Sequence, residues 1–134
     1  MGDAIIASVI LRSMRRSPNF ERGDARVPGG LRPHLRSDEV VVGTYQNPEP
    51  GARYLIVFTE VAINIMEGEQ LTRRLSWADV VGYESPKADS NIEGVRLQTR
   101  DGTYVVPIAG SFGPGSKFKD AFNLTMVFRS LLGR

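Results

Sequence analysis

Residues 53–66 read RYLIVFTEVAINIM, and this stretch carries the strongest structural signal in the chain. Two apolar runs, 53–59 and 61–66, have only Glu60 between them, so we expect a tight turn that joins two antiparallel strands. In the second run, residues 61, 63 and 65 point one way and residues 62, 64 and 66 point the other way. This alternation is typical of a sheet with one buried face.

Strand patterns continue on both sides of this hairpin. The most specific local signal is the pair Asp101-Gly102, which stands between two alternating stretches. Such a pair predicts a hairpin with a type I′ turn, because both residues tolerate positive φ. With the central hairpin, the sequence predicts seven strands. The other five are residues 39–46, 71–77, 80–85, 93–100 and 103–109.

A helical pattern flanks the strands at either end. Residues 3–16 place their apolar side chains on a wide arc, with Ser8, Arg12 and Arg15 on the remainder, so they predict an amphipathic helix. Its apolar face has to be buried against its own domain, a partner or a lipid surface. Residues 116–132 predict a second amphipathic helix, which closes the core.

The segment between the first helix and the first strand is rich in proline, glycine and arginine. Residues 17–37 show little apolar periodicity, which is typical of a linker or a loosely attached arm. We therefore divide the chain into an N-terminal helix with its linker, residues 1–36, and one folded domain, residues 37–134.

The order of these elements resembles a known superfold. The strands Tyr54–Thr59 and Val61–Ile65, the segment Leu75–Tyr83 and the hairpin Val95–Ile108 are similar to the bacterial and GRAM-type branch of the pleckstrin-homology-like (PH-like) domains. The resemblance implies a mainly β fold: a barrel of seven antiparallel strands in two near-orthogonal sheets, capped by a C-terminal helix. The N-terminal amphipathic helix lies outside the resemblance.

Composition excludes several kinds of chemistry. The chain has no cysteine and one histidine, His34, so thiolate nucleophiles, thiolate zinc sites, iron–sulfur ligation and multi-histidine metal centres are excluded. The acidic residues fall mainly in predicted turns and at outward strand positions, with no converging acid–base group. We therefore predict that the protein is not an enzyme, with no catalytic residue, no cofactor and no metal ligand.

The basic charge belongs to the N-terminal arm. Residues 1–36 contain seven arginines against three acidic residues, a net charge of +4, whereas residues 37–134 carry −2. This excess is modest and lacks interleaved aromatic residues, so it does not favour nucleic acid. PH-like domains that bind phosphoinositides carry a basic cluster on their first two strands, but residues 40–54 contain only Arg53. No specific phosphoinositide site is therefore expected.

The resemblance then implies a noncatalytic module for protein contact or self-association. The alternative is peripheral attachment to an anionic membrane through the basic amphipathic helix. Protein contact is preferred, because no tryptophan or phenylalanine precedes Phe20 to anchor the helix in lipid. The candidate contact residues, for a partner or an anionic surface, are Arg12, Arg15, Arg16, Arg53, Arg73 and Arg74.

The sequence also makes a prediction about location. The longest apolar run, residues 4–11, falls far short of the ~20 residues that span a bilayer. Asp3 precedes this run and the arginines follow it, which is the reverse of a signal peptide. We expect a cytoplasmic protein, or one peripheral to the inner face of the membrane.

Overall fold

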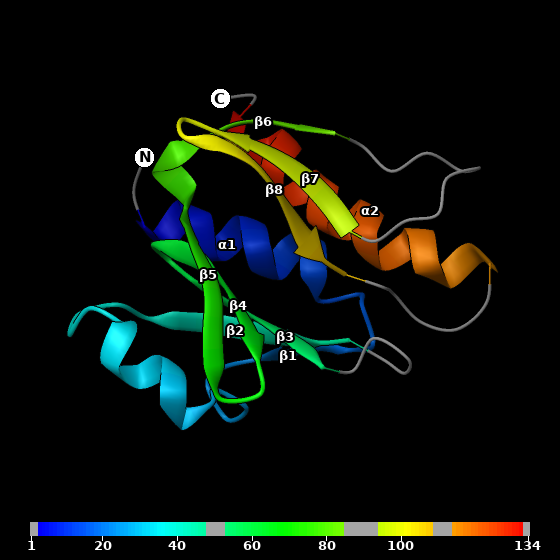
Figure 1. Cartoon of the computed structure of the whole chain (residues 1–134). Coiled ribbons are helices and arrows are strands. Elements are labelled where there is room, and N and C mark those ends of the chain that lie inside the picture. The colour runs from blue at the N-terminus through cyan, green and yellow to red at the C-terminus, as the bar shows by residue number, and fades with distance from the viewer. Residues whose placement is uncertain (1–2, 48–52, 85–93, 109–113, 133–134) are drawn as a thin grey trace.

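The computed structural model describes residues 3–47, 53–84, 94–108 and 114–132, without the side chains of 3–4 and 114–119. The protein is mainly β, and one long helix precedes the strands and another follows them (Figure 1). In chain order the elements are α1 (Asp3–Met14), β1 (Phe20–Arg22), the 3₁₀ helix η1 (Gly29–His34), β2 (Val41–Gln46), β3 (Tyr54–Thr59), β4 (Ala62–Glu67), β5 (Gln70–Ser76), the 3₁₀ helix η2 (Trp77–Asp79), β6 (Val80–Glu84), β7 (Gly94–Thr99), β8 (Gly102–Pro107) and α2 (Pro114–Leu132).

The strands form two antiparallel sheets. The first has the order β1-β2-β3-β4-β5 and the second β6-β7-β8. The predicted central hairpin is β3–β4, with Phe58 opposite Ile63. The mainly β architecture with an N-terminal and a C-terminal helix is thus confirmed. The described residues contain eight strands, and none of them pairs across the two sheets, so the seven-strand count and the closed barrel are not confirmed.

The strand that the sequence analysis missed is β1, which lies in the segment assigned to a linker. Its three residues pair with β2, placing Phe20 opposite Tyr45. Three residues are too few to show an alternating pattern, so no periodicity could reveal this strand. The Phe20 ring occupies the space beside Gly43, where a Cβ atom would come within 2.4 Å of the ring. Glycine at position 43 therefore makes room for β1.

The turn of the β7–β8 hairpin differs from the prediction. Thr99 pairs with Gly102, so Arg100 and Asp101 form the loop. A type I′ turn needs positive φ at both central residues, and no non-glycine residue of the described ranges has one. The type I′ assignment was therefore wrong. The Thr99 hydroxyl instead donates to Asp101 Oδ1 at 2.7 Å, which closes the turn through side chains.

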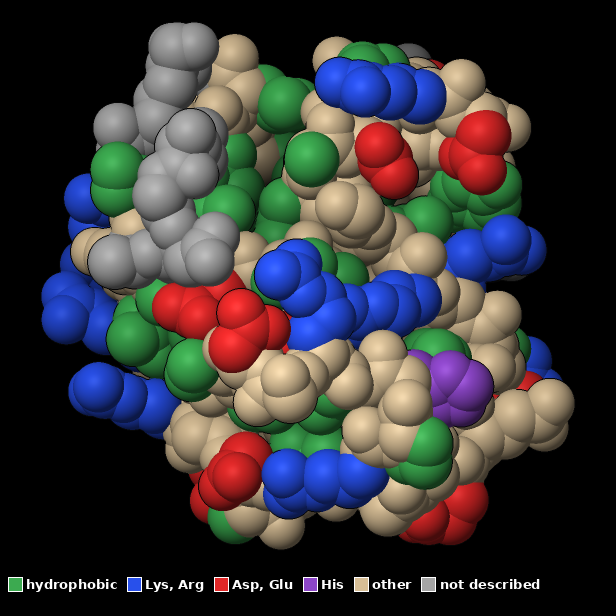
Figure 2. All heavy atoms as spheres, turned by 90° about the vertical axis from the view of Figure 1, so that its left-hand side faces the viewer, with side chains coloured by type: hydrophobic (Ala, Val, Ile, Leu, Met, Phe, Trp, Pro, Cys, Tyr) green, Lys and Arg blue, Asp and Glu red, His purple; other side chains and the backbone are tan. Residues whose placement is uncertain are grey.

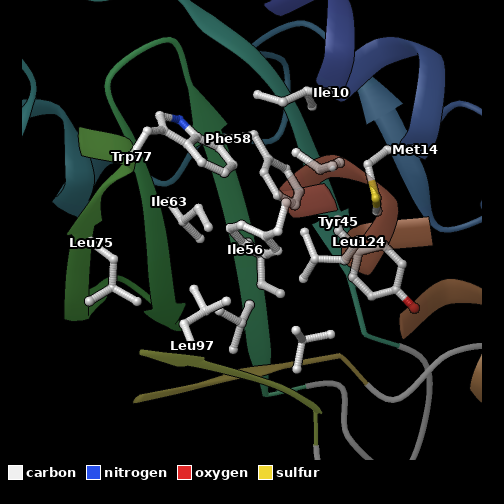
Figure 3. Packing of buried hydrophobic residues seen from close by; sticks show 14 of the residues in the cluster. Ile10, Met14, Tyr45, Ile56, Phe58, Ile63, Leu75, Trp77, Leu97 and Leu124 are labelled. Atoms are coloured by element: carbon white, nitrogen blue, oxygen red, sulfur yellow. The ribbon is translucent and has the colours of Figure 1, made fainter. Parts of the chain in front are cut away.

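The main core lies between the two sheets and the two helices. Four apolar side chains of α1 are buried, and Ile10 and Met14 have no exposed surface. They pack with Tyr45, Ile56 and Phe58 of the first sheet and with side chains of α2 (Figure 3). The apolar face of α1 is thus buried inside the chain itself, and α2 also packs against β6 and β7.

A second, smaller core covers the other face of the first sheet. Leu31 of η1 is fully buried against Leu55, Val57 and Met66. Figure 1 shows η1, in cyan, and α1, in blue, on opposite sides of this sheet. The expectation of one buried face was therefore wrong. The apolar side chains at every position from Tyr54 to Phe58 are the signal of a strand buried on both faces.

Two polar side chains link separate layers of the structure. Asn47 follows β2, and its Nδ2 donates to Tyr54 O of the first sheet at 3.0 Å and to Pro107 O of the second sheet at 2.9 Å. The Tyr45 hydroxyl, which points toward α2 in Figure 3, donates to Asp120 Oδ2 at 2.6 Å. These bonds fix the end of the first sheet against β8 and α2.

Candidate functional site

The structure separates the six predicted arginines into different surroundings. Arg53 and Arg73 line one cleft between the two sheets. Arg12 and Arg15 line a groove beside α1, and Arg16 is exposed outside that groove. Arg74 is bound inside a polar network. Among the described residues in Figure 2, basic and acidic side chains are interspersed on this face.

The cleft opens where β5 of the first sheet faces β8 of the second sheet, and its volume is about 730 Å³. Its lining combines two arginines and two tyrosines with hydroxyl, amide and apolar side chains. The lining residues are Asn47, Arg53, Tyr54, Ile65, Thr72, Arg73, Thr103, Tyr104, Val105, Pro107 and Ile108. We call this site the inter-sheet cleft.

Arg73 comes from β5 and reaches across to the second sheet. Its guanidinium carbon lies 4.3 Å from the centroid of the Tyr104 ring, which is a cation–π contact. No carboxylate of the described residues lies within ion-pair distance of Arg73, and its side chain is exposed. Its charge is therefore held in a defined place but is not neutralised by a described acidic group.

Arg53 is held in a similar way. Its guanidinium carbon lies 4.6 Å from the centroid of the Tyr54 ring, and its Nη2 donates to the Tyr54 hydroxyl at 2.7 Å. Arg53 Nε also lies 3.7 Å from Glu67 Oε2, in a solvent-exposed ion pair. Such a pair is weak, since water screens both charges.

Comparison with known proteins adds no relative. The chain matches no protein-family model, no curated protein and no solved structure.

Two other polar side chains of the cleft, those of Asn47 and Thr72, are engaged within the protein. Asn47 uses its side-chain amide to join the sheets, and Thr72 Oγ1 donates to Ile65 O at 2.9 Å. The two guanidinium groups are thus the strongest donors that the cleft offers to a ligand. Beside them, Val105 offers exposed apolar surface, and Ile65 and Ile108, which also line the cleft, are buried in the main core. The arrangement suits an anionic group attached to an apolar body.

Arg74 has a structural role in the described network. Its Nη2 lies 2.6 Å from Glu39 Oε1, and its Nη1 donates to Asn64 Oδ1 at 2.8 Å. The Glu39 side chain has no exposed surface. Arg73 and Arg74 therefore lie on opposite faces of β5, where one faces the cleft and the other faces the segment before β2.

The same network changes the acidity of Glu39. Burial by itself would raise the pKa of this carboxyl group, but hydrogen bonds from Arg74, Thr59 and the Arg36 backbone N–H outweigh that effect. The pKa of Glu39 is therefore lowered below its ordinary value of 4.5. The carboxylate stays charged at neutral pH. Its contact with Arg74 makes this arginine unavailable to a ligand from solution.

Two other titratable groups, Asp120 and His34, lie outside the cleft. Asp120 is buried with 1% exposure, so a ligand cannot reach its carboxylate. His34 is exposed in the last turn of η1. In the ranges that the structure describes, no three His, Asp or Glu side chains gather as metal ligands. Those ranges also contain no helix with the length and hydropathy to cross a membrane.

Sequence reasoning missed the two tyrosines of the cleft and Arg22 of the groove. Tyr104 stands 31 positions after Arg73, and only the packing of the two sheets brings them together. Arg22 belongs to β1, the strand in the segment that the sequence analysis assigned to a linker. One signal in the sequence was Tyr54, an aromatic residue with a hydroxyl group that directly follows Arg53.

Proposed function

We propose that the protein is a noncatalytic PH-like binding module that acts through protein contact, and that the inter-sheet cleft receives an acidic side chain of its partner. The observation that carries this proposal is Arg73, whose guanidinium is fixed over Tyr104 without an acidic partner among the described residues. A second guanidinium, that of Arg53, lines the same cleft.

The order of elements supports the PH-like part of the proposal. β2 to β5 and β6 to β8 form consecutive antiparallel strands in two sheets, and α2 follows them and packs against β6 and β7. β1, η1 and α1 are additions to that plan. The cleft lies where the two sheets separate, a position at which side-chain variation can create a ligand site without disturbing the core.

A carboxylate is the partner group that best fits the cleft chemistry. A guanidinium presents a planar set of N–H donors that pairs with two carboxylate oxygens at once. The Tyr104 ring lies against the face of the Arg73 guanidinium and leaves its N–H edges free to pair with a ligand, whereas Arg53 already directs N–H groups to Tyr54 and Glu67. The exposed Val105 side chain can contact a neighbouring apolar side chain of the partner.

Protein contact is preferred over membrane attachment because of where α1 packs. Insertion of its apolar face into lipid would require the removal of Ile6, Val9, Ile10 and Met14 from the core. Burial of each of these side chains contributes roughly 1.5–3 kcal/mol to the stability of the folded protein. Self-association through an exposed sheet edge remains a prediction of the same class, because β5 and β8 both have one unpaired edge among the described strands.

The test uses the full chain and a fluorescein-labelled hexaglutamate peptide, with binding followed by fluorescence polarisation at about 50 mM salt. We expect saturable binding that R73A weakens by about 5-fold or more. The matched control is R96A, since Arg96 is also an exposed strand arginine but lies outside the cleft and pairs with Glu84 at 3.3 Å. Equal binding by R73A and the wild type, or absence of saturable binding, would reject the proposal.

A further inference from the structure

We infer that the groove between α1 and β1 is a second docking site, which fits an acidic protein segment carrying one bulky apolar side chain. This arginine groove is separate from the inter-sheet cleft and has a volume of about 870 Å³. Its lining residues are Ala7, Ser8, Leu11, Arg12, Arg15, Phe20, Arg22 and Glu60.

The charges of the arginine groove distinguish it from the rest of the surface. Arg12, Arg15 and Arg22 are all exposed, and none has an acidic partner within ion-pair distance in the described ranges. Most other described arginines do have one. The paired arginines are Arg26 with Glu21, Arg32 with Asp24, Arg36 with Asp38, Arg53 with Glu67, Arg74 with Glu39 and Arg96 with Glu84.

Local structure places these charges on both sides of the groove. Arg15 follows the last residue of α1, and its backbone N–H still bonds to Leu11 O at 3.1 Å. This helical turn places Arg15 on the same side as Arg12, about 5–6 Å apart at their Cβ atoms. Arg22 ends β1 on the other side. Glu60 is the only acidic side chain that lines the groove among the described residues. The excess positive charge calls for a ligand with at least two carboxylates.

The floor of the groove is apolar and firmly supported. Leu11 and Phe20 are half-buried and pack against the main core. The Phe20 ring centroid lies 6.0 Å from that of Phe58, a fully buried residue. A bulky apolar side chain placed between acidic neighbours would cover this floor while its neighbours pair with the arginines.

The shape of the groove favours a protein segment over a membrane. A bilayer offers a broad surface and cannot fill a concave site whose apolar part lies at its floor. The apolar face of α1 is also occupied by the main core. An extended or helical peptide can insert one side chain, so we assign the groove to an acidic protein segment and treat a membrane as an outcome of the test.

The two sites are independent, because they lie at opposite ends of β3. Tyr54, the first residue of this strand, lines the cleft, and Glu60, which follows the last residue, lines the groove. At about 3.3 Å per residue, these ends are roughly 20 Å apart. Variants at one site can therefore be tested without a change in the other.

The experiment is a titration of the isotope-labelled full chain with an acetylated and amidated Glu-Glu-Leu-Glu-Glu peptide, followed by two-dimensional NMR. We expect the backbone signals of Leu11, Phe20 and Arg22 to shift, and R12A/R22A to weaken the affinity by about 10-fold. The matched control is R16A, because Arg16 is an exposed arginine next to Arg15 that does not line the groove. R73A should leave the shifts at the groove intact, even if the cleft proposal fails.

Three results would overturn the inference. An R16A effect as large as that of R12A/R22A would show attraction by charge alone. Equal affinity for a Glu-Glu-Ser-Glu-Glu peptide would show that the groove does not recognise the apolar side chain of the ligand. Sedimentation with phosphatidylglycerol vesicles, without shifts from the peptide, would assign the surface to lipid. The unfolding transition of each variant is measured beside these titrations, and R12Q/R22Q replaces the alanine variant if the latter unfolds at a lower denaturant concentration than the wild type.

Discussion

The guanidinium of Arg73 and the ring of Tyr104 meet across the two sheets, with 4.3 Å between the guanidinium carbon and the ring centroid. One residue belongs to β5 and the other to β8, which do not pair with each other. The contact therefore orients a charge within the inter-sheet cleft by means of an aromatic surface. It predicts that the ring, and not the tyrosine hydroxyl, prepares Arg73 for a ligand.

Substitution of Tyr104 separates the contribution of its ring from that of its hydroxyl group. Y104A should weaken hexaglutamate binding by about 3- to 5-fold, because Arg73 loses the surface that restricts its motion. Y104F keeps the ring and should bind within about 2-fold of the wild type. Polarisation titrations of the three proteins provide the measurement. If Y104F were as weak as Y104A, the hydroxyl group and not the ring would be responsible.

The Glu39–Arg74 pair predicts how stability depends on pH. The pKa of Glu39 is below 4.5 in the folded protein, whereas the unfolded chain has the ordinary value. The stabilisation is thus fully present above pH 4.5 and is lost as pH falls through the folded pKa. E39Q should lack this part of the acid-dependent loss. Urea unfolding at a series of pH values will show whether the difference between wild type and E39Q shrinks below pH 4.5.

Removal of the arginine partner tests the same network at neutral pH. R74A leaves the carboxylate of Glu39, whose side chain has no exposed surface, without its nearest cation. We expect a loss of about 3 kcal/mol in the free energy of unfolding. R73A is the control on the adjacent residue and should change stability by less than about 1 kcal/mol, since its side chain is exposed. Similar losses in both variants would contradict this assignment.

Asn47 should be the most sensitive link between the two sheets. N47A removes the donors to Tyr54 O and Pro107 O at a buried position, and the expected loss is about 2–3 kcal/mol in the free energy of unfolding. N123A is a milder comparison, because Asn123 makes one half-buried bond to Ser17 Oγ at 2.9 Å. Chemical unfolding followed by tryptophan fluorescence measures both. Equal losses would mean that the Asn47 bonds do not join the sheets energetically.

Two neighbouring glycines provide a test of the η1 segment. A Cβ atom on Gly30 would lie 1.8 Å from Glu69 O, whereas one on Gly29 would lie 3.5 Å from Glu69 Oε1, an ordinary contact. G30A should therefore destabilise the protein by about 1–3 kcal/mol, and G29A should have little effect.

Limited trypsin digestion shows whether G30A affects the η1 segment locally. Arg26 and Arg36 flank η1 and are not followed by proline, so G30A should speed cleavage after these two residues relative to G29A and the wild type. Identical cleavage patterns would indicate that η1 does not depend on the close approach of Gly30 to Glu69.

The sequence predicted the parts of the fold that depend on local pattern. The β3–β4 hairpin, the strands after it and both helices appear at nearly the expected residues, because alternation and helical periodicity extend over several residues there. β1 and η1 escaped prediction for the opposite reason. Their three and six residues, rich in glycine and charge, acquire structure only from the sheet that they contact.

The candidate site was less predictable than the fold. Arginine composition marked Arg73 and Arg74 equally, but Arg74 pairs with a residue 35 positions away and Arg73 does not. Such a difference depends on packing between distant segments and leaves no local pattern. Arg12 and Arg15 could be placed on one side of a helix from spacing alone, whereas the third member of the groove, Arg22, required β1.

The packing of α1 against α2 has a consequence for synthesis of the chain. The first helix ends at Met14 and its partner begins at Pro114, so about 100 residues must be translated between them. At 5–20 residues per second, the apolar face of α1 waits roughly 5–20 s for the helix that covers it. During that interval its buried residues Ile6, Val9 and Ile10 lack the contacts that α2 provides. The contacts between the two helices therefore form only after all of the described strands have been made.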